Sequence, residues 1–133
     1  MAKIMIVDDS KLFLAILERA LREWGHEVFK VSDGYNVIPE FNKCKPDLII
    51  LDYQMPASLG NVVYERLRGL TAGETVPIIF LSGTSHFELE MMIPPGNRVR
   101  FRDKSIDLEG LRVDINEMLT AAGIPLPPAP GTP

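Results

Sequence analysis

Short apolar runs alternate with segments of helical periodicity along this chain. Ile4–Val7, Leu48–Leu51 and Ile78–Leu81 are unbroken apolar runs bounded by polar or turn residues. Such runs are typical of parallel strands that are buried on both faces. Val28–Val31 and Val99–Phe101 are more polar, which indicates strands at the edges of the same sheet.

The segments between these runs repeat their apolar residues at steps of three and four. Residues 12–24 carry one such stripe and are followed by Gly25, and residues 108–122 carry another and are followed by Gly123. A glycine after the last periodic residue is a helix stop signal, so both segments are predicted to be amphipathic helices. Residues 62–70 predict a shorter helix in the middle of the chain.

Prolines limit two further helices. Pro39 lies inside the second helical segment, where it would remove a backbone hydrogen bond, so we expect that helix to start late or to kink. Pro94 and Pro95 are expected to end the fourth helix by about Met92. With these helices, strand and helix alternate along the whole chain. This order predicts a doubly wound α/β fold with a five-stranded parallel sheet and helices on both faces.

Composition narrows the class of protein. The 133 residues suit one domain, which we place at residues 1–123, and 46% hydrophobic and 24% charged residues are ordinary for a globular protein. A net charge of −4 argues against a general nucleic-acid-binding surface. Cys44 is the single cysteine, so no internal disulfide is possible, and no signal segment or long apolar run is present. We therefore expect a soluble cytoplasmic protein without membrane contact.

The last ten residues, 124–133, are rich in proline and predict a flexible tail or the start of a linker. Both a stand-alone domain and a fragment of a longer protein are compatible with such a tail.

Chemically active side chains follow the predicted strands. Asp8 and Asp9 end the first strand, Asp52 ends the third, Ser82 ends the fourth, and Lys104 follows the fifth. In open α/β sheets, ligands bind outside the carboxyl ends of the strands. We therefore expect three carboxylates, a hydroxyl and an ammonium group to converge there.

Three neighbouring carboxylates repel one another unless a cation lies between them. Oxygen-only ligands select hard divalent ions, and Mg²⁺ favours sites that are completed by phosphate oxygens. Asp8 and Asp9 are therefore predicted metal ligands. The alternative is that one aspartate caps the first helix and the other is merely solvated.

The same set of groups suits phosphoryl transfer, in which catalysis is mainly positioning and charge stabilisation. Asp52 can act as the nucleophile, while Lys104 and the Ser82 hydroxyl would contact phosphoryl oxygens. Taken singly, Ser82 could be only a turn residue and Lys104 only an exposed lysine.

Together these residues resemble the receiver domain of two-component response regulators, from Lys3 to about Gly123. The resemblance rests on five short motifs at family spacing, which are VDDS (7–10), SDG (32–34), LDYQMP (51–56), LSG (81–83) and FRDK (101–104). It implies a flavodoxin-like strand order of 2-1-3-4-5. It also implies that the protein is a signalling domain rather than an enzyme.

The resemblance assigns a role to each site residue. It implies that Asp52 is the phosphoacceptor, and that Mg²⁺ is held by Asp52, by Asp9 directly, by Asp8 through water and by the backbone carbonyl of Gln54. Ser82 and Lys104 would contact the phosphoryl group. Ser82 and Phe101 would be the switch residues.

The chain departs from the family at two places. The family usually has proline after its lysine, whereas Ser105 follows Lys104 here, so we expect a trans peptide bond and a helix that starts at Ser105. At residues 93–96 the chain has IPPG, where receivers normally continue their fourth helix with small residues. Both departures concern the surface that receivers commonly use for output.

The favoured function is a switch that accepts a phosphoryl group from a histidine kinase or phosphotransfer protein and then engages an unknown downstream protein. One alternative is a pseudo-receiver that binds its partner constitutively. A phosphatase of the haloacid dehalogenase type would need an acid at Gln54, and a flavin-binding protein would need a phosphate-cradling loop in place of DDSK.

Other residues suggest weaker hypotheses. His26 and His86 lack metal-type spacing and are expected in exposed turn or helix-start positions. Cys44 is expected to be partly buried. A stripe of three arginines along one strand is either a basic docking patch or a solvated edge, and it comprises Arg98, Arg100 and Arg102.

Overall fold

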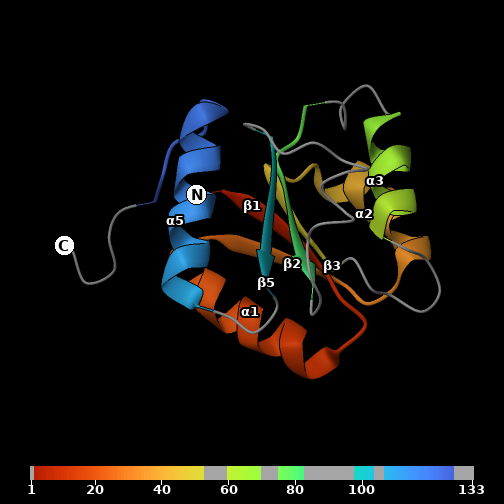
Figure 1. Ribbon diagram of the computed structural model, residues 1–133, viewed down its shortest axis with the longest axis horizontal. Coiled ribbons are helices and arrows are strands. Elements are labelled where there is room, and N and C mark those ends of the chain that lie inside the picture. Colours follow the sequence, from red (N-terminus) through yellow and green to blue (C-terminus); the bar gives the residue numbers. More distant parts are fainter. Residues whose placement is uncertain (1, 53–59, 70–74, 83–97, 104–106, 128–133) are drawn as a thin grey trace.

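A computed structural model describes residues 2–52, 60–69, 75–82, 98–103 and 107–127 of the protein (Figure 1). The strands are β1 (Lys3–Val7), β2 (Glu27–Val31), β3 (Leu48–Asp52), β4 (Ile78–Ser82) and β5 (Val99–Asp103). The helices are α1 (Lys11–Glu23), the 3-10 turn η1 (Gly34–Asn36), α2 (Val37–Cys44), α3 (Gly60–Arg68) and α5 (Leu108–Ala121). The predicted fourth helix, with its expected end near Met92, lies outside the described residues.

The five strands form one parallel sheet in the order β2-β1-β3-β4-β5, which is the flavodoxin-like order. Val7 at the end of β1 is in register with Val31 on one side and Leu51 on the other. The chain leaves β1 toward β2 and later returns to the other side of β1 as β3. The carboxyl ends of β1 and β3 are therefore neighbours whose connections diverge, which is where ligands bind in this class of fold.

Helices cover both faces of the sheet, as predicted. One apolar cluster joins the sheet to α1 and α5, and a second joins it to α2 and α3. Figure 1 shows α1 and α5 on one side of the strands and α2 and α3 on the other. All five residues of β3 are buried, whereas the edge strands β2 and β5 are partly exposed. The continuous apolar runs thus identify strands that are covered on both faces.

Polar caps and glycines set the helix ends. The Ser10 hydroxyl accepts a hydrogen bond from the backbone N–H of Phe13 and starts α1. Gly123 has a φ of +78° after α5, and the backbone N–H of Ile124 donates to the carbonyl of Leu119. This arrangement satisfies a terminal carbonyl that the helix leaves free. The last helix begins at Leu108 with Asp107 as its N-cap residue, so the expected start at Ser105 is wrong.

The late start of the second helix is confirmed. Residues 34–36 form η1, and α2 begins only at Val37. Pro39 is therefore in the first turn, where backbone N–H groups have no partner within the helix and a missing N–H costs nothing.

The described part of the tail contacts the domain. Ile124 packs against the cluster under α1 and α5. A Cβ atom added to Gly25, which has a φ of +92°, would come within 2.8 Å of Pro127, so this segment lies close to the end of α1. Within the ranges that the structure describes, none of the helices has the length and apolar character needed to cross a lipid bilayer.

Candidate metal and phosphoryl site

Three aspartates meet at the carboxyl end of the sheet. Asp8 and Asp9 directly follow β1, and Asp52 is the last residue of β3. One carboxylate oxygen of each lies within 4.8 Å of the others. Asp8 and Asp52 are buried, with 1% and 2% of their surface exposed, whereas Asp9 faces solvent. The site therefore has two acids in the protein interior and one at its mouth.

Local hydrogen bonds fix Asp8 in this position. Its backbone N–H donates to the carbonyl of Val31 at 3.1 Å, which extends the pairing of β1 with β2 by one residue. Its Oδ1 accepts a hydrogen bond of 2.8 Å from the backbone N–H of Ser10. Because Ser10 itself caps α1, the alternative in which an aspartate caps this helix is wrong.

The donor set fits a hard divalent cation. All of the donors are carboxylate oxygens, which suit Mg²⁺, Mn²⁺ or Ca²⁺ rather than softer metals. Oxygens on opposite sides of one Mg²⁺ ion are about 4.2 Å apart, given bonds of about 2.1 Å. A spread of up to 4.8 Å therefore leaves room for one of the three acids to bind through a water molecule. The buried carboxylates also gain most from a cation, since burial of charge is costly without compensation.

The remaining predicted site residues are only partly described. Ser82 is the last residue of β4 and is in register with Asp103, but its side chain is outside the described part of the structure. Gln54 and Lys104 also lie outside the described residues, as does the peptide bond that joins Lys104 to Ser105. Phe101 lies on β5 with its ring stacked on Phe80.

Two members of the arginine stripe, Arg100 and Arg102, are ion-paired to α5. The Nη1 atom of Arg100 contacts Asp114 Oδ1 at 3.0 Å and Glu117 Oε1 at 2.8 Å, and Arg102 Nε contacts Asp114 Oδ2 at 2.5 Å. The bond to Glu117 raises the pKa of Arg100, and the bond to Asp114 raises that of Arg102. Of the three arginines, only Arg98 is exposed.

Asp114 is the residue that the sequence interpretation missed. It is buried, although it carries a carboxylate. The available signal was its position, because it falls within the apolar stripe that joins Leu111 to Met118 on α5. A charged residue on the buried side of a helix calls for a basic partner from a neighbouring element.

Two other expectations concern buried side chains. The sequence predicts an exposed His26, but only 4% of its surface is accessible, and burial lowers its pKa. Pro127, about a hundred residues further along the chain, lies close to the neighbouring Gly25, and a local pattern does not reveal such a contact. Cys44 is buried rather than partly buried, and burial raises the pKa of its thiol. His86 lies outside the described residues.

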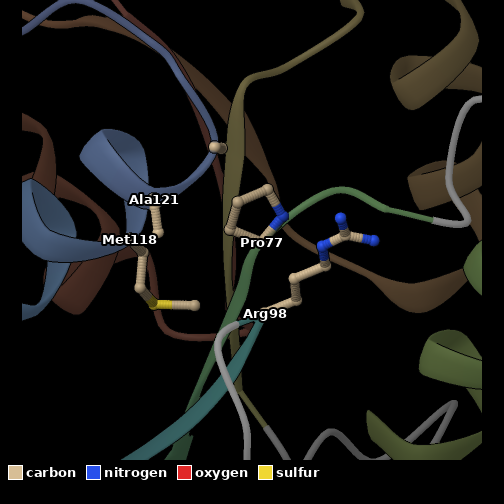
Figure 2. A pocket seen from close by; sticks show the side chains of 5 residues that line it. Pro77, Arg98, Met118 and Ala121 are labelled. Atoms are coloured by element: carbon tan, nitrogen blue, oxygen red, sulfur yellow. The ribbon is translucent and has the colours of Figure 1, made fainter.

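A cavity of about 100 Å³ lies at the opposite edge of the sheet (Figure 2). Pro77 and Arg98, which directly precede β4 and β5, line it together with residues near the end of α5, namely Met118, Ala121 and Ala122. This cavity lies at the amino ends of β4 and β5, whereas the three aspartates lie at the carboxyl ends of β1 and β3, so the cavity is no part of the acidic site.

Comparison with known proteins gives one consistent family. The response regulator receiver domain matches residues 4–115 of the chain. PilH of Pseudomonas aeruginosa is 31% identical over 122 residues, covering 90% of this chain and 98% of PilH. The sensory transduction protein BceR of Halalkalibacterium halodurans is 38% identical over 86 residues, covering 65% of this chain. The chain spans about a third of the length of BceR and of several other curated relatives, with 36% of BceR covered.

Solved structures agree in fold. The chemotaxis protein CheY4 of Vibrio cholerae superimposes with a TM-score of 0.81 at 24% identity, covering 90% of this chain and 99% of that one. A receiver domain from Clostridium thermocellum superimposes with a TM-score of 0.83 at 21% identity, covering 92% and 98%. At these identities the likeness concerns the fold alone.

Proposed function

Because the chain belongs to the response regulator receiver domain family, we propose that it is a phosphorylation-dependent switch with Asp52 as its phosphoacceptor. Receiver domains are signalling domains rather than conventional enzymes, and they interact with histidine kinases or phosphotransfer proteins. The proposed donor is such a kinase or phosphotransfer protein in the cytoplasm. The observation that carries this proposal is the convergence of Asp8, Asp9 and Asp52 within 4.8 Å.

Asp52 is the best placed nucleophile of the three acids. It ends the central strand β3 in register with Leu81 of β4, and 2% of its surface is exposed, so its position is fixed by the sheet. A carboxylate oxygen of Asp52 would attack the phosphorus of the donor and form an acyl phosphate. The bond from phosphorus to the donor's leaving group breaks, and the leaving group keeps the electron pair.

The other two acids would hold the cation together with Asp52. Asp9, which is exposed, would bind Mg²⁺ directly, Asp8 would bind through water, and the backbone carbonyl of Gln54 would complete the protein ligands. When bound, the ion would neutralise charge on the phosphoryl oxygens. Asp8 keeps its orientation through the bond from the Ser10 N–H, so this ligand is positioned before any substrate arrives.

The hydroxyl of Ser82 and the ammonium of Lys104 would contact the remaining phosphoryl oxygens, from the ends of β4 and β5. Such contacts would draw Ser82 toward the site and allow the Phe101 ring to move with it. Hydrolysis of the acyl phosphate at the same site would reset the switch.

A pseudo-receiver that binds its partner constitutively is the competing function. It has no need of three acids at one sheet edge, because buried carboxylates cost stability when they serve no ligand. The intact acid cluster therefore favours the phosphorylated switch.

The test is incubation with acetyl phosphate, with and without Mg²⁺, followed over time by intact mass. We expect a gain of one phosphoryl group that requires Mg²⁺ and is absent from Asp52→Asn. The matched control is Asp33→Asn, which removes the charge of a partly exposed aspartate that caps η1. A parent protein that gains no mass at any donor concentration would favour the pseudo-receiver.

A further inference from the structure

The ring of Phe101 on β5 is stacked on the ring of Phe80 on β4. The two residues are in register, their ring centroids are 5.5 Å apart, and their planes differ by 13°. Phe80 is completely buried, whereas Phe101 is only partly buried. The position of the Phe101 ring is therefore determined by a buried ring that cannot easily move.

Phe80 has a second aromatic neighbour on the helical layer. Tyr64 of α3 lies with its ring centroid 5.7 Å from that of Phe80, at an angle of 50°. Both geometries are within the range in which aromatic rings attract one another. Tyr64, Phe80 and Phe101 thus form an aromatic row that runs from α3 through β4 to β5.

Arg68 anchors the end of the aromatic row on α3. Its guanidinium lies 5.0 Å from the centroid of the Tyr64 ring, one helical turn away. The same group donates hydrogen bonds to the backbone carbonyls of Val76 at 2.6 Å and Arg98 at 3.3 Å, which precede β4 and β5. Tyr64 is therefore held against the two strands that carry the other rings.

We propose that Tyr64 is a positioning residue that holds the Phe101 ring in its observed orientation through Phe80. The packing role of Tyr64 does not depend on the proposed function. Its effect on phosphorylation does, because Phe101 is the switch aromatic in that function. The aromatic row favours the orientation that is present without a phosphoryl group. Whatever contacts Tyr64 on α3 would in turn bias phosphorylation, because coupling between two sites is reciprocal.

An aromatic contact of ordinary strength changes the equilibrium between two ring orientations by about two- to tenfold, and we expect a change of this size for the Phe101 ring. Loss of the Tyr64 ring weakens the observed orientation by that factor. The phosphorylated state then becomes easier to reach, so labelling by a small phosphodonor should be about two- to tenfold faster.

The first measurement is fluorine NMR of protein labelled with fluorophenylalanine, without Mg²⁺ or donor. The Phe101 signal is assigned by its loss in Phe101→Leu. Tyr64→Leu should shift or broaden this signal, and Tyr64→Phe, which keeps the ring, should restore it. Tyr64→Met is a second variant without the ring should the leucine variant fail to fold.

Tyr35→Leu is the matched control, because Tyr35 is 70% exposed and lies on η1, away from the aromatic row. This control should leave the Phe101 signal where it is. A Phe101 signal that is the same in Tyr64→Leu, Tyr64→Met and the parent would overturn the proposal.

The second measurement is the rate of labelling by acetyl phosphate at limiting concentration. Faster labelling of Tyr64→Leu at unchanged Mg²⁺ affinity supports the coupling, since loss of packing alone would not accelerate the reaction. An equal rate in the parent and the variant would overturn it. A parent that takes up no phosphoryl group would refute the proposed function instead. The fluorine NMR experiment would still test the aromatic row, because it needs neither Mg²⁺ nor a phosphodonor.

Discussion

Arg102 and Asp114 form an ion pair of 2.5 Å that ties β5 to α5, although they are twelve residues apart in the sequence. The Arg102 guanidinium lies against Gly110, which is in the first turn of α5. A Cβ atom at Gly110 would collide with Nη1 of Arg102 and would come within 2.9 Å of Asp107 Oδ2. A glycine inside a helix normally costs stability, and here it provides the space for the ion pair.

The first prediction concerns Gly110→Ala. Within a helix, this change normally stabilises a protein by about 0.5–1 kcal/mol. We expect no such gain here, because the added methyl group displaces Arg102 from Asp114. In an Arg102→Ala background the usual gain should return, and chemical unfolding of the four proteins measures both values. An equal gain in stability from Gly110→Ala with and without Arg102 would show that the ion pair does not need the space beside Gly110.

The second prediction concerns Asp114→Asn. This change removes the charge that two arginines share, at a side chain that is 11% exposed. We expect a loss of about 1–3 kcal/mol in the free energy of unfolding, the range for charged groups left without their partner. Glu117→Gln is the matched control, and because that side chain is 58% exposed it should cost under about 1 kcal/mol. Equal losses for both variants would contradict the central role of Asp114.

Much of the fold could be predicted from local patterns. The runs at Ile4–Val7, Leu48–Leu51 and Ile78–Leu81 each became a buried strand, since a strand covered on both faces needs apolar residues at every position. The meeting of Asp8 and Asp52 also followed, because the carboxyl ends of neighbouring parallel strands lie at one edge.

The errors concern contacts between distant segments. His26 is buried although its local sequence carries no signal of burial, and Pro127, far along the chain, lies close to the neighbouring Gly25. The alternation along β5 correctly predicted that Arg100 and Arg102 lie on one face of the strand. Their acidic partners on α5 could not be predicted, because they depend on how that helix packs against the sheet. Asp114 could have been suspected from its place on an apolar stripe.

The third prediction is a pH dependence of stability that comes from His26. Burial lowers its pKa from an ordinary value of about 6.5, with further help from the positive charges of the chain's amino terminus and of Arg112. The unfolded chain therefore binds this proton more tightly than the folded protein does. The stabilisation is complete above about pH 6.5 and is lost as the pH falls from there through the lowered pKa of the folded state.

Urea unfolding between pH 5 and 8, a range of about three units around the ordinary histidine pKa, measures this effect. The midpoint should fall with pH in the parent and fall less in His26→Gln. His86→Gln, at the only other histidine of the sequence, should behave as the parent does. The same slope in His26→Gln and the parent would mean that another group is responsible.

The fourth prediction concerns Asp9 as a proposed metal ligand. Asp9→Asn should weaken Mg²⁺ binding by at least about tenfold, because loss of even an indirect contact to a metal site commonly costs that much. Asp47→Asn removes the same charge at the other edge of the sheet, just before β3, and should leave the affinity nearly unchanged. Isothermal titration compares the two variants. Similar losses would indicate a general charge effect rather than a ligand.

The most direct test of the central claim is to locate the phosphoryl group. After labelling with acetyl phosphate and Mg²⁺, borohydride reduces an aspartyl phosphate to homoserine, and peptide mass mapping identifies the position. We predict homoserine at position 52 alone, because Asp52 is the proposed nucleophile and one of its carboxylate oxygens lies within 4.8 Å of those of Asp8 and Asp9. Homoserine at another aspartate, or a labelled protein with Asp52 intact, would contradict the account.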